Sequence, residues 1–125
     1  MSDLILVVDD EEDNREALIE ALSTAGYQAI MSPNWQSAEK GLESMEYDVV
    51  VTEIFMSGRD GLSIIEEIQQ RIPGTKVIAM AKKRQEITQA KALKAAAKVG
   101  ADATMQKPVD ADAVVEAVRS LVGNP

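Results

Sequence analysis

The sequence contains no cysteine and no histidine, and aromatic residues make up only 3% of it. The absence of cysteine excludes disulfides, iron–sulfur clusters and zinc–thiolate sites. The absence of histidine removes the commonest metal ligand and the commonest general base. Any metal ion bound by side chains must therefore be a hard cation held by oxygen ligands.

The sequence also lacks a hydrophobic run of membrane-spanning length, and its N-terminus has no basic, apolar leader. A net charge of −8 argues against nucleic-acid binding over the whole surface. Hydrophobic residues make up 46% of the 125 residues, which is enough for the core of one domain. We therefore expect a single cytoplasmic domain over residues 1–125, with neither nucleic acid nor a membrane as its partner.

Short apolar runs alternate with longer amphipathic stretches along the chain. Strands are expected at 4–9, 28–31, 49–53, 76–81 and 103–105, and helices at 13–25, 34–45, 60–71, 84–99 and 110–122. Near-continuous apolar runs suit parallel strands covered on both faces, and their alternation with helices predicts right-handed crossovers. Asp13, Asn34 and Asp110 are the expected helix N-caps. The predicted fold class is α/β: a doubly wound, five-stranded parallel sheet in the order 2-1-3-4-5, the flavodoxin-like arrangement.

Charged residues follow the strands at one edge of this sheet. Asp9 and Asp10 end the first strand, Glu53 ends the third, and Lys107 lies just past the fifth. Because ligands bind at the carboxyl ends of parallel strands, we expect these side chains to converge there. Repulsion among the carboxylates favours a divalent cation such as magnesium. A solvated acidic helix start is the alternative, and for residues 11–13 it is the preferred interpretation.

These motifs resemble the receiver domains of bacterial two-component response regulators, and the resemblance covers nearly all of the chain. It rests on Asp9–Asp10, the strand 48–52 before Glu53, the run 56–61, and Lys107 followed by Pro108. The resemblance implies that position 53 is the phosphoacceptor position, normally an aspartate that takes a phosphoryl group from a histidine kinase. It also implies that the ammonium of Lys107 reaches the phosphoryl oxygens. The peptide bond between Lys107 and Pro108 is commonly cis in this family.

The same resemblance implies a weak magnesium site. Its protein ligands would be Asp10, the carboxylate of Glu53 and the backbone carbonyl of Phe55, with Asp9 acting partly through water. In the alternative, Glu53 fills the metal position by pairing with Lys107, and magnesium binding is undetectable.

Four positions depart from the family pattern together. Glu53 replaces the aspartate, and its extra methylene extends the carboxylate by roughly 1.5 Å. Ala81 stands where the fourth strand usually ends in a serine or threonine that binds the phosphoryl group. Thr104 stands where an aromatic ring usually moves with that hydroxyl, and Ser57 stands where proline is usual. We interpret the set as natural degeneration of the switch, in preference to one designed substitution.

From Ala81 to Gly100 the chain is four residues longer than the usual family spacing, which is about one helical turn, and the segment 82–98 within it is basic. It holds six of the 13 basic residues and one acid, so its net charge is +5. Lys91, Lys94 and Lys98 share one helical face, and Ile87 lies among the lysines. This face is a candidate surface for an acidic protein partner; the alternative, preferred on sequence alone, is a solvated alanine-rich helix.

We therefore expect a stand-alone atypical receiver that works in two-component or phosphorelay signalling through contact with another protein. Its phosphorylation is weakened or lost, it is not an enzyme, and the length leaves no room for a DNA-binding output domain. The alternative is a receiver that accepts a phosphoryl group on Glu53 from a histidine kinase or phosphotransfer protein. A flavin carrier is disfavoured because the acidic loop would repel a flavin phosphate. A phosphohydrolase of the haloacid dehalogenase type is disfavoured because it needs two aspartates separated by one residue, and Asp9 and Asp10 are adjacent. The expected partner is a histidine kinase or an output protein, and the expected state is a monomer or weak homodimer.

Overall fold

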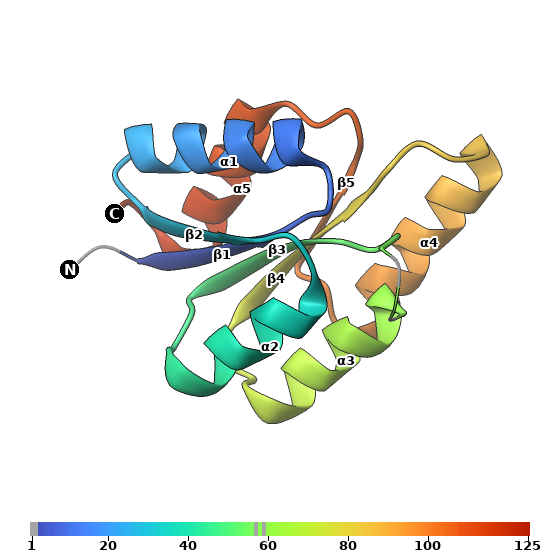
Figure 1. Ribbon diagram of the computed structural model, residues 1–125. Coiled ribbons are helices and arrows are strands. Elements are labelled where there is room, and N and C mark those ends of the chain that lie inside the picture. Colours follow the sequence, from blue (N-terminus) through green and yellow to red (C-terminus); the bar gives the residue numbers. More distant parts are fainter. Residues whose placement is uncertain (1–2, 57, 59) are drawn as a thin grey trace.

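A five-stranded parallel sheet in the order β2-β1-β3-β4-β5 forms the centre of the computed structural model (Figure 1). The structure describes residues 3–56, 58 and 60–125, and at residues 86 and 87 the backbone alone. The strands are β1 (Leu4–Val8), β2 (Gln28–Ser32), β3 (Val49–Glu53), β4 (Lys76–Ala81) and β5 (Ala103–Gln106). The helices are α1 (Glu12–Thr24), α2 (Trp35–Ser44), α3 (Gly61–Arg71), α4 (Glu86–Val99) and α5 (Ala111–Val122). The predicted fold class is confirmed.

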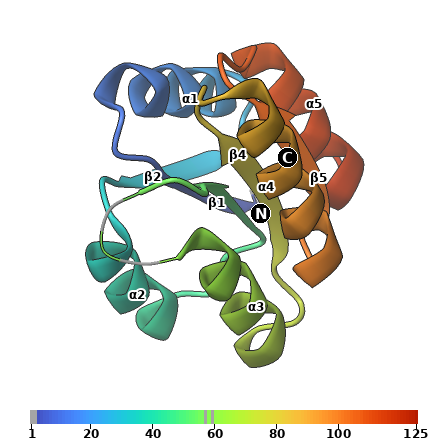
Figure 2. The same cartoon turned by 90° about the vertical axis from the view of Figure 1, so that its right-hand side faces the viewer.

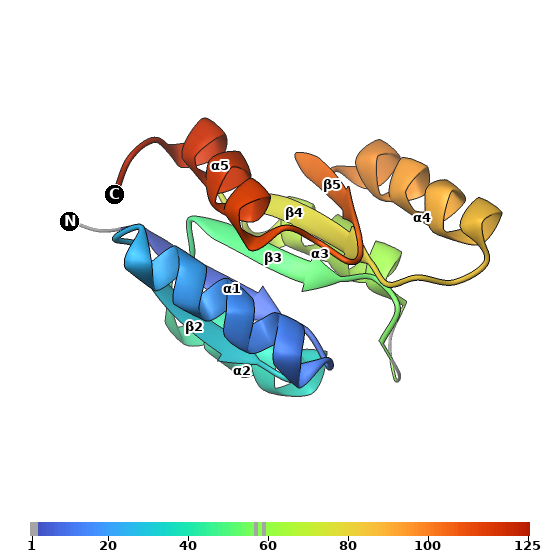
Figure 3. The ribbon, with the colours of Figure 1, turned by 90° about the horizontal axis from the view of Figure 1, so that it is seen from above.

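Helices cover both faces of the sheet. Helices α1 and α5 lie on one face, while α2, α3 and α4 lie on the other (Figures 2 and 3). Alternate residues of a strand point to opposite faces, so Ile5 and Val7 join the core under α1 and α5, while Leu6 and Val8 join the other core. Burial on both faces is the physical reason why the strands read as continuous apolar runs.

Helix boundaries follow the capping residues in most places. The side chains of Asn34 and Asp110 accept hydrogen bonds from backbone N–H groups at the starts of α2 and α5, as expected. The expectation for Asp13 is wrong, because α1 begins at Glu12 and its cap residue, Glu11, makes no side-chain cap hydrogen bond. In the part of the chain that the structure describes, no helix has the length and apolar character needed to cross a membrane.

Candidate functional site

Three buried charged residues meet where the strands end. Asp9 directly follows β1, Glu53 is the last residue of β3, and Lys107 directly follows β5. The Lys107 Nζ lies 2.7 Å from Asp9 Oδ2 and 2.8 Å from Glu53 Oε1. Asp9 and Glu53 are wholly buried, and Lys107 is 7% exposed. The sheet topology therefore brings these three residues together, as their positions after the strands predict.

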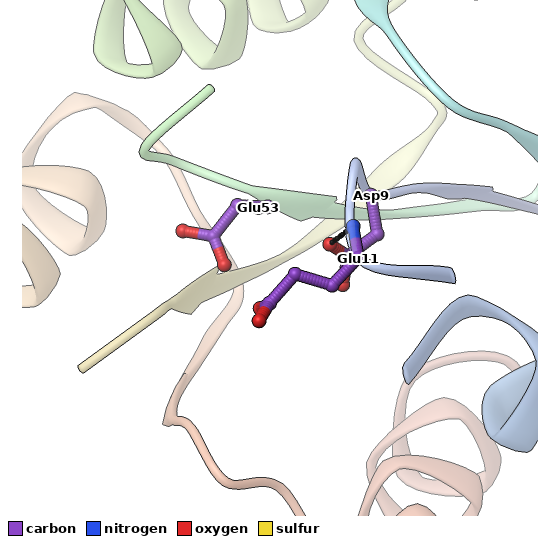
Figure 4. A group of neighbouring side chains, drawn as sticks. All are labelled: Asp9, Glu11 and Glu53. Carbon is purple, nitrogen blue, oxygen red and sulfur yellow. Dashed lines mark hydrogen bonds between the residues drawn. The ribbon is translucent and has the colours of Figure 1, made fainter. Parts of the chain in front are cut away.

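The third carboxylate of the group belongs to Glu11. Its Oε1 lies 2.5 Å from Lys107 Nζ, and carboxylate oxygens of Asp9, Glu11 and Glu53 lie within 4.8 Å of one another (Figure 4). Glu11 is the N-cap residue of α1 and its side chain is half exposed, which agrees with the expected solvated helix start, and the same side chain also contacts Lys107. The Glu11 N–H donates to Asp9 Oδ1 at 2.9 Å, and this tight turn brings the Glu11 side chain back over the strand ends.

Asp10 lies outside this group. Its side chain is partly exposed and its Oδ1 lies 3.0 Å from the Nζ of Lys82, in the loop after β4. Neighbouring side chains of an extended segment point to opposite sides, so Asp9 and Asp10 face different surroundings. The role of Asp10 as a metal ligand stays a prediction, as does that of the Phe55 carbonyl. Lys82 was not among the predicted site residues, although it directly follows β4 as Asp9 follows β1.

The carboxylate of Glu53 is held by donors from three segments. Its Oε2 accepts hydrogen bonds from the N–H of Phe55 at 2.9 Å and from the N–H of Lys82 at 3.0 Å. Its Oε1 is buried beside the ammonium of Lys107 and receives no hydrogen bond of good geometry from the described residues. We call these two N–H groups and the ammonium the anion cradle. The chain's own carboxylate fills this cradle.

The electrostatics of the group keep Lys107 charged. Burial alone lowers the pKa of a lysine, but the close contacts of the ammonium with the carboxylates of Asp9, Glu11 and Glu53 outweigh it and raise the pKa of Lys107 above its ordinary value. One ammonium facing three carboxylates leaves a formal charge of −2 when all are ionised. The group is therefore attractive to a further cation.

Carboxylate oxygens are the ligands that a hard cation prefers, but the ammonium of Lys107 already lies between the three carboxylates. Magnesium prefers oxygen ligands at about 2.0 to 2.1 Å and calcium at about 2.3 to 2.6 Å. Asp9, Glu11 and Glu53 could supply three such oxygens. Lys107 Nζ already lies within 2.8 Å of an oxygen of each. A divalent ion that used all three would have to displace it.

Of the two switch positions that the resemblance implies, position 81 has no hydroxyl and position 104 has no aromatic ring. Ala81 is wholly buried at the end of β4, and Thr104 is exposed on β5. The bond between Lys107 and Pro108 is cis, which agrees with the resemblance. Ser57 lies outside the described residues.

The basic face of α4 is exposed to solvent. Lys91, Lys94 and Lys98 are exposed, whereas Leu93 and Ala96 on the opposite side of the helix are buried in the core. The amphipathic character predicted for this segment is therefore confirmed. The side chain of Ile87 lies outside the described part of the chain, and the use of this face for binding stays a prediction.

Comparison with known proteins decides the family. Residues 5–119 match the family described as "Response regulator receiver domain". The chain belongs to this family. A receiver domain is a signalling domain of two-component systems, and the match covers the acidic residues, the acceptor position and the lysine of the site described above.

Curated relatives of this receiver domain are longer response regulators. The chain is 31% identical over 121 residues to the DNA-binding transcriptional regulator NtrC of Escherichia coli strain K12, covering 97% of this chain and 25% of that protein. It is 28% identical over 120 residues to the response regulator RR06 of Streptococcus pneumoniae, covering 94% of this chain and 52% of that protein. The chain thus spans about a quarter to a half of the length of these relatives.

Solved receiver structures share the fold over nearly the whole chain. A response regulator from Thermotoga maritima superposes with a TM-score of 0.84 at 25% identity, covering 99% of this chain and 100% of that one. The beryllofluoride-activated NtrC4 receiver domain dimer has a TM-score of 0.84 at 25% identity, covering 94% of both chains.

Proposed function

We propose that this receiver domain signals by protein contact in one fixed conformation, with phosphorylation weakened or lost. The observation that carries the proposal is the filled anion cradle. Glu53 Oε2 accepts from two backbone N–H groups, and Glu53 Oε1 lies 2.8 Å from Lys107 Nζ. The side chain that would have to attack a phosphoryl group already uses the donors that would hold that group.

Phosphoryl transfer needs the attacking oxygen in line with the leaving group and preorganised donors on the phosphoryl oxygens. For Glu53 to attack, its carboxylate would have to leave the N–H groups of Phe55 and Lys82. Those donors would then be free, but the longer side chain would have to fold back from the space that the phosphoryl group enters. This movement of the Glu53 carboxylate breaks its two charge-assisted hydrogen bonds, each of which is worth about 1.5 to 3 kcal/mol.

The missing switch residues support the fixed conformation. A receiver responds when a phosphoryl group makes different contacts in two states, since a ligand shifts an equilibrium only by its differential affinity. The methyl group of Ala81 cannot bind a phosphoryl oxygen, and Thr104 has no ring to exchange between positions. An anion bound in the cradle therefore has no side chain to move on β4 or β5.

The alternative function is a receiver that still accepts a phosphoryl group on Glu53 from a histidine kinase or phosphotransfer protein. Family membership favours it, because the acidic residues and Lys107 remain. The two functions differ in their response to beryllium fluoride with magnesium, followed by the amide NMR spectrum. We expect no shift of amides in β4, α4 and β5; shifts spreading along these elements would favour the alternative.

We further propose that Asp9, Glu11 and Glu53 hold magnesium weakly. The resemblance instead points to Asp10 and the Phe55 carbonyl, together with Glu53. Magnesium titrations of Glu11→Gln and Asp10→Asn variants separate the two ligand sets. We expect Glu11→Gln to weaken binding and Asp10→Asn to leave it unchanged; the reverse would assign the site to Asp10.

The proposed partner is a histidine kinase or an output protein that contacts the basic face of α4. Exposure of Lys91, Lys94 and Lys98 supports an acidic partner surface. We also propose that residues 1–125 form one domain that acts in the cytoplasm, as a monomer or weak homodimer. Light scattering across a concentration series tests the oligomeric state, with the chain mass of 13.5 kDa as the monomer value.

A further inference from the structure

A buried glutamine in α4 contacts the backbone at the edge of the site. Gln89 is 5% exposed, although it lies on a helix that is otherwise basic and alanine-rich. Its Nε2 donates to the carbonyl oxygen of Ala81 at 2.8 Å and to the carbonyl oxygen of Lys107 at 3.3 Å. The first carbonyl ends β4, and the second belongs to the lysine of the anion cradle. Gln89 thus joins the two strand ends between which the family switch normally works.

The geometry identifies the amide nitrogen as the group that faces the strands. Backbone carbonyls only accept hydrogen bonds, and a glutamine NH₂ is the one part of that side chain with two donors. The N–H of Lys107 also donates to the Ala81 carbonyl at 2.9 Å. This contact lies just beyond the last ladder pair, Ala81 with Gln106. The amide therefore continues the cross-strand bonding past the point where the sheet ends.

We propose that Gln89 is a positioning residue that fixes the backbone of Lys107 against β4 and so keeps its ammonium among the carboxylates. A hydroxyl at the end of β4 can rotate and exchange partners, whereas a primary amide held by a helix donates to both carbonyls at once. Helix α4 packs on β4 and β5, which carry these carbonyls. Gln89 lies in α4, within the segment between Ala81 and Gly100. The inference holds whether or not Glu53 accepts a phosphoryl group.

The test compares Gln89→Met with Leu93→Ala. Methionine keeps the length and volume of the side chain and removes both donors, whereas Leu93→Ala weakens the same helix in the core and leaves the amide in place. The measurement is the rate at which an amine-reactive acetylating reagent modifies Lys107 in the folded protein, mapped by mass spectrometry. We expect Gln89→Met to be modified about tenfold faster than Leu93→Ala, the factor that corresponds to losing one or two ordinary hydrogen bonds.

A purely structural role would make Lys107 react at the same rate in two variants of equal stability, and that result would overturn the proposal. A second measurement needs no variant. In the wild-type protein the side-chain NH₂ of Gln89 should exchange with water at least tenfold more slowly than that of the exposed Gln36, because both of its hydrogens are bonded. Equal exchange rates at the two glutamines would also reject the role of Gln89.

Discussion

Replacement of Lys107 by methionine tests the electrostatic balance of the site. Methionine keeps most of the apolar stem and removes the ammonium, which lies 2.5 to 2.8 Å from oxygens of Asp9, Glu11 and Glu53. Two unit charges within 4.8 Å of each other repel by at least about 3.5 kcal/mol at an effective dielectric constant of about 20. Glu11 is half exposed and can turn into water, so the largest remaining repulsion is between Asp9 and Glu53. Breaking such a buried pair typically costs about 3 kcal/mol, which is the loss of stability that we expect.

Magnesium should reverse much of this loss. Without the ammonium, the carboxylates have an open centre and a formal charge of −3, so a divalent ion binds the variant more tightly than the wild type. Saturation at about 100 times the dissociation constant stabilises a protein by about 2.7 kcal/mol. Urea unfolding with and without magnesium measures the effect through the fluorescence of Trp35, the only tryptophan of the chain, which is buried.

The matched control is Lys82→Met. It removes an ammonium from the partly exposed pair with Asp10, which is worth at most about 1 kcal/mol. We expect a small loss of stability and no added response to magnesium in this control. Equal stabilisation of the wild type and Lys107→Met by magnesium would refute the reasoning, because it would mean that the ammonium and the metal do not share a position.

Three further predictions follow from the same contacts. A Glu53→Asp variant should regain slow phosphorylation by acetyl phosphate, since Lys107 remains, but amide shifts should stay confined to the site until Ala81→Thr and Thr104→Tyr are added. The pKa of Lys107 in the folded protein is raised above its ordinary value of 10.5. The charged lysine therefore stabilises the fold below pH 10.5, and this stabilisation is lost as the pH rises through the folded-state pKa. The difference in unfolding free energy between wild type and Lys107→Met should therefore shrink above pH 10.5. Reversing the charges of the basic face of α4 should weaken partner binding at least tenfold at low salt, and calorimetry with the captured partner checks this.

The sheet and the meeting of Asp9, Glu53 and Lys107 could be predicted because both depend on pattern. Near-continuous apolar runs define the strands, and parallel strands bring their carboxyl ends to one edge. Charged residues that directly follow three of these strands then have little freedom to point elsewhere. The buried ion pairs are a consequence of topology.

The contacts of Glu11 and Gln89 could not be predicted in this way. The direction of a loop side chain depends on backbone dihedral angles, which the hydrophobic pattern does not determine. The pattern therefore could not predict that Glu11 points toward the site and Asp10 points away from it. Gln89 lies on a helix whose polar residues are expected in solvent. Only its distance from two carbonyl oxygens identifies it as part of the site.

The mass of the unaltered protein after incubation with acetyl phosphate and magnesium tests the central claim most directly. Glu53 Oε2 is engaged by the N–H groups of Phe55 and Lys82, and its Oε1 lies beside Lys107. The account therefore predicts no protein carrying an added phosphoryl group, under conditions in which Glu53→Asp gains one. Rapid addition of a phosphoryl group to the wild-type chain, mapped to Glu53, would contradict it.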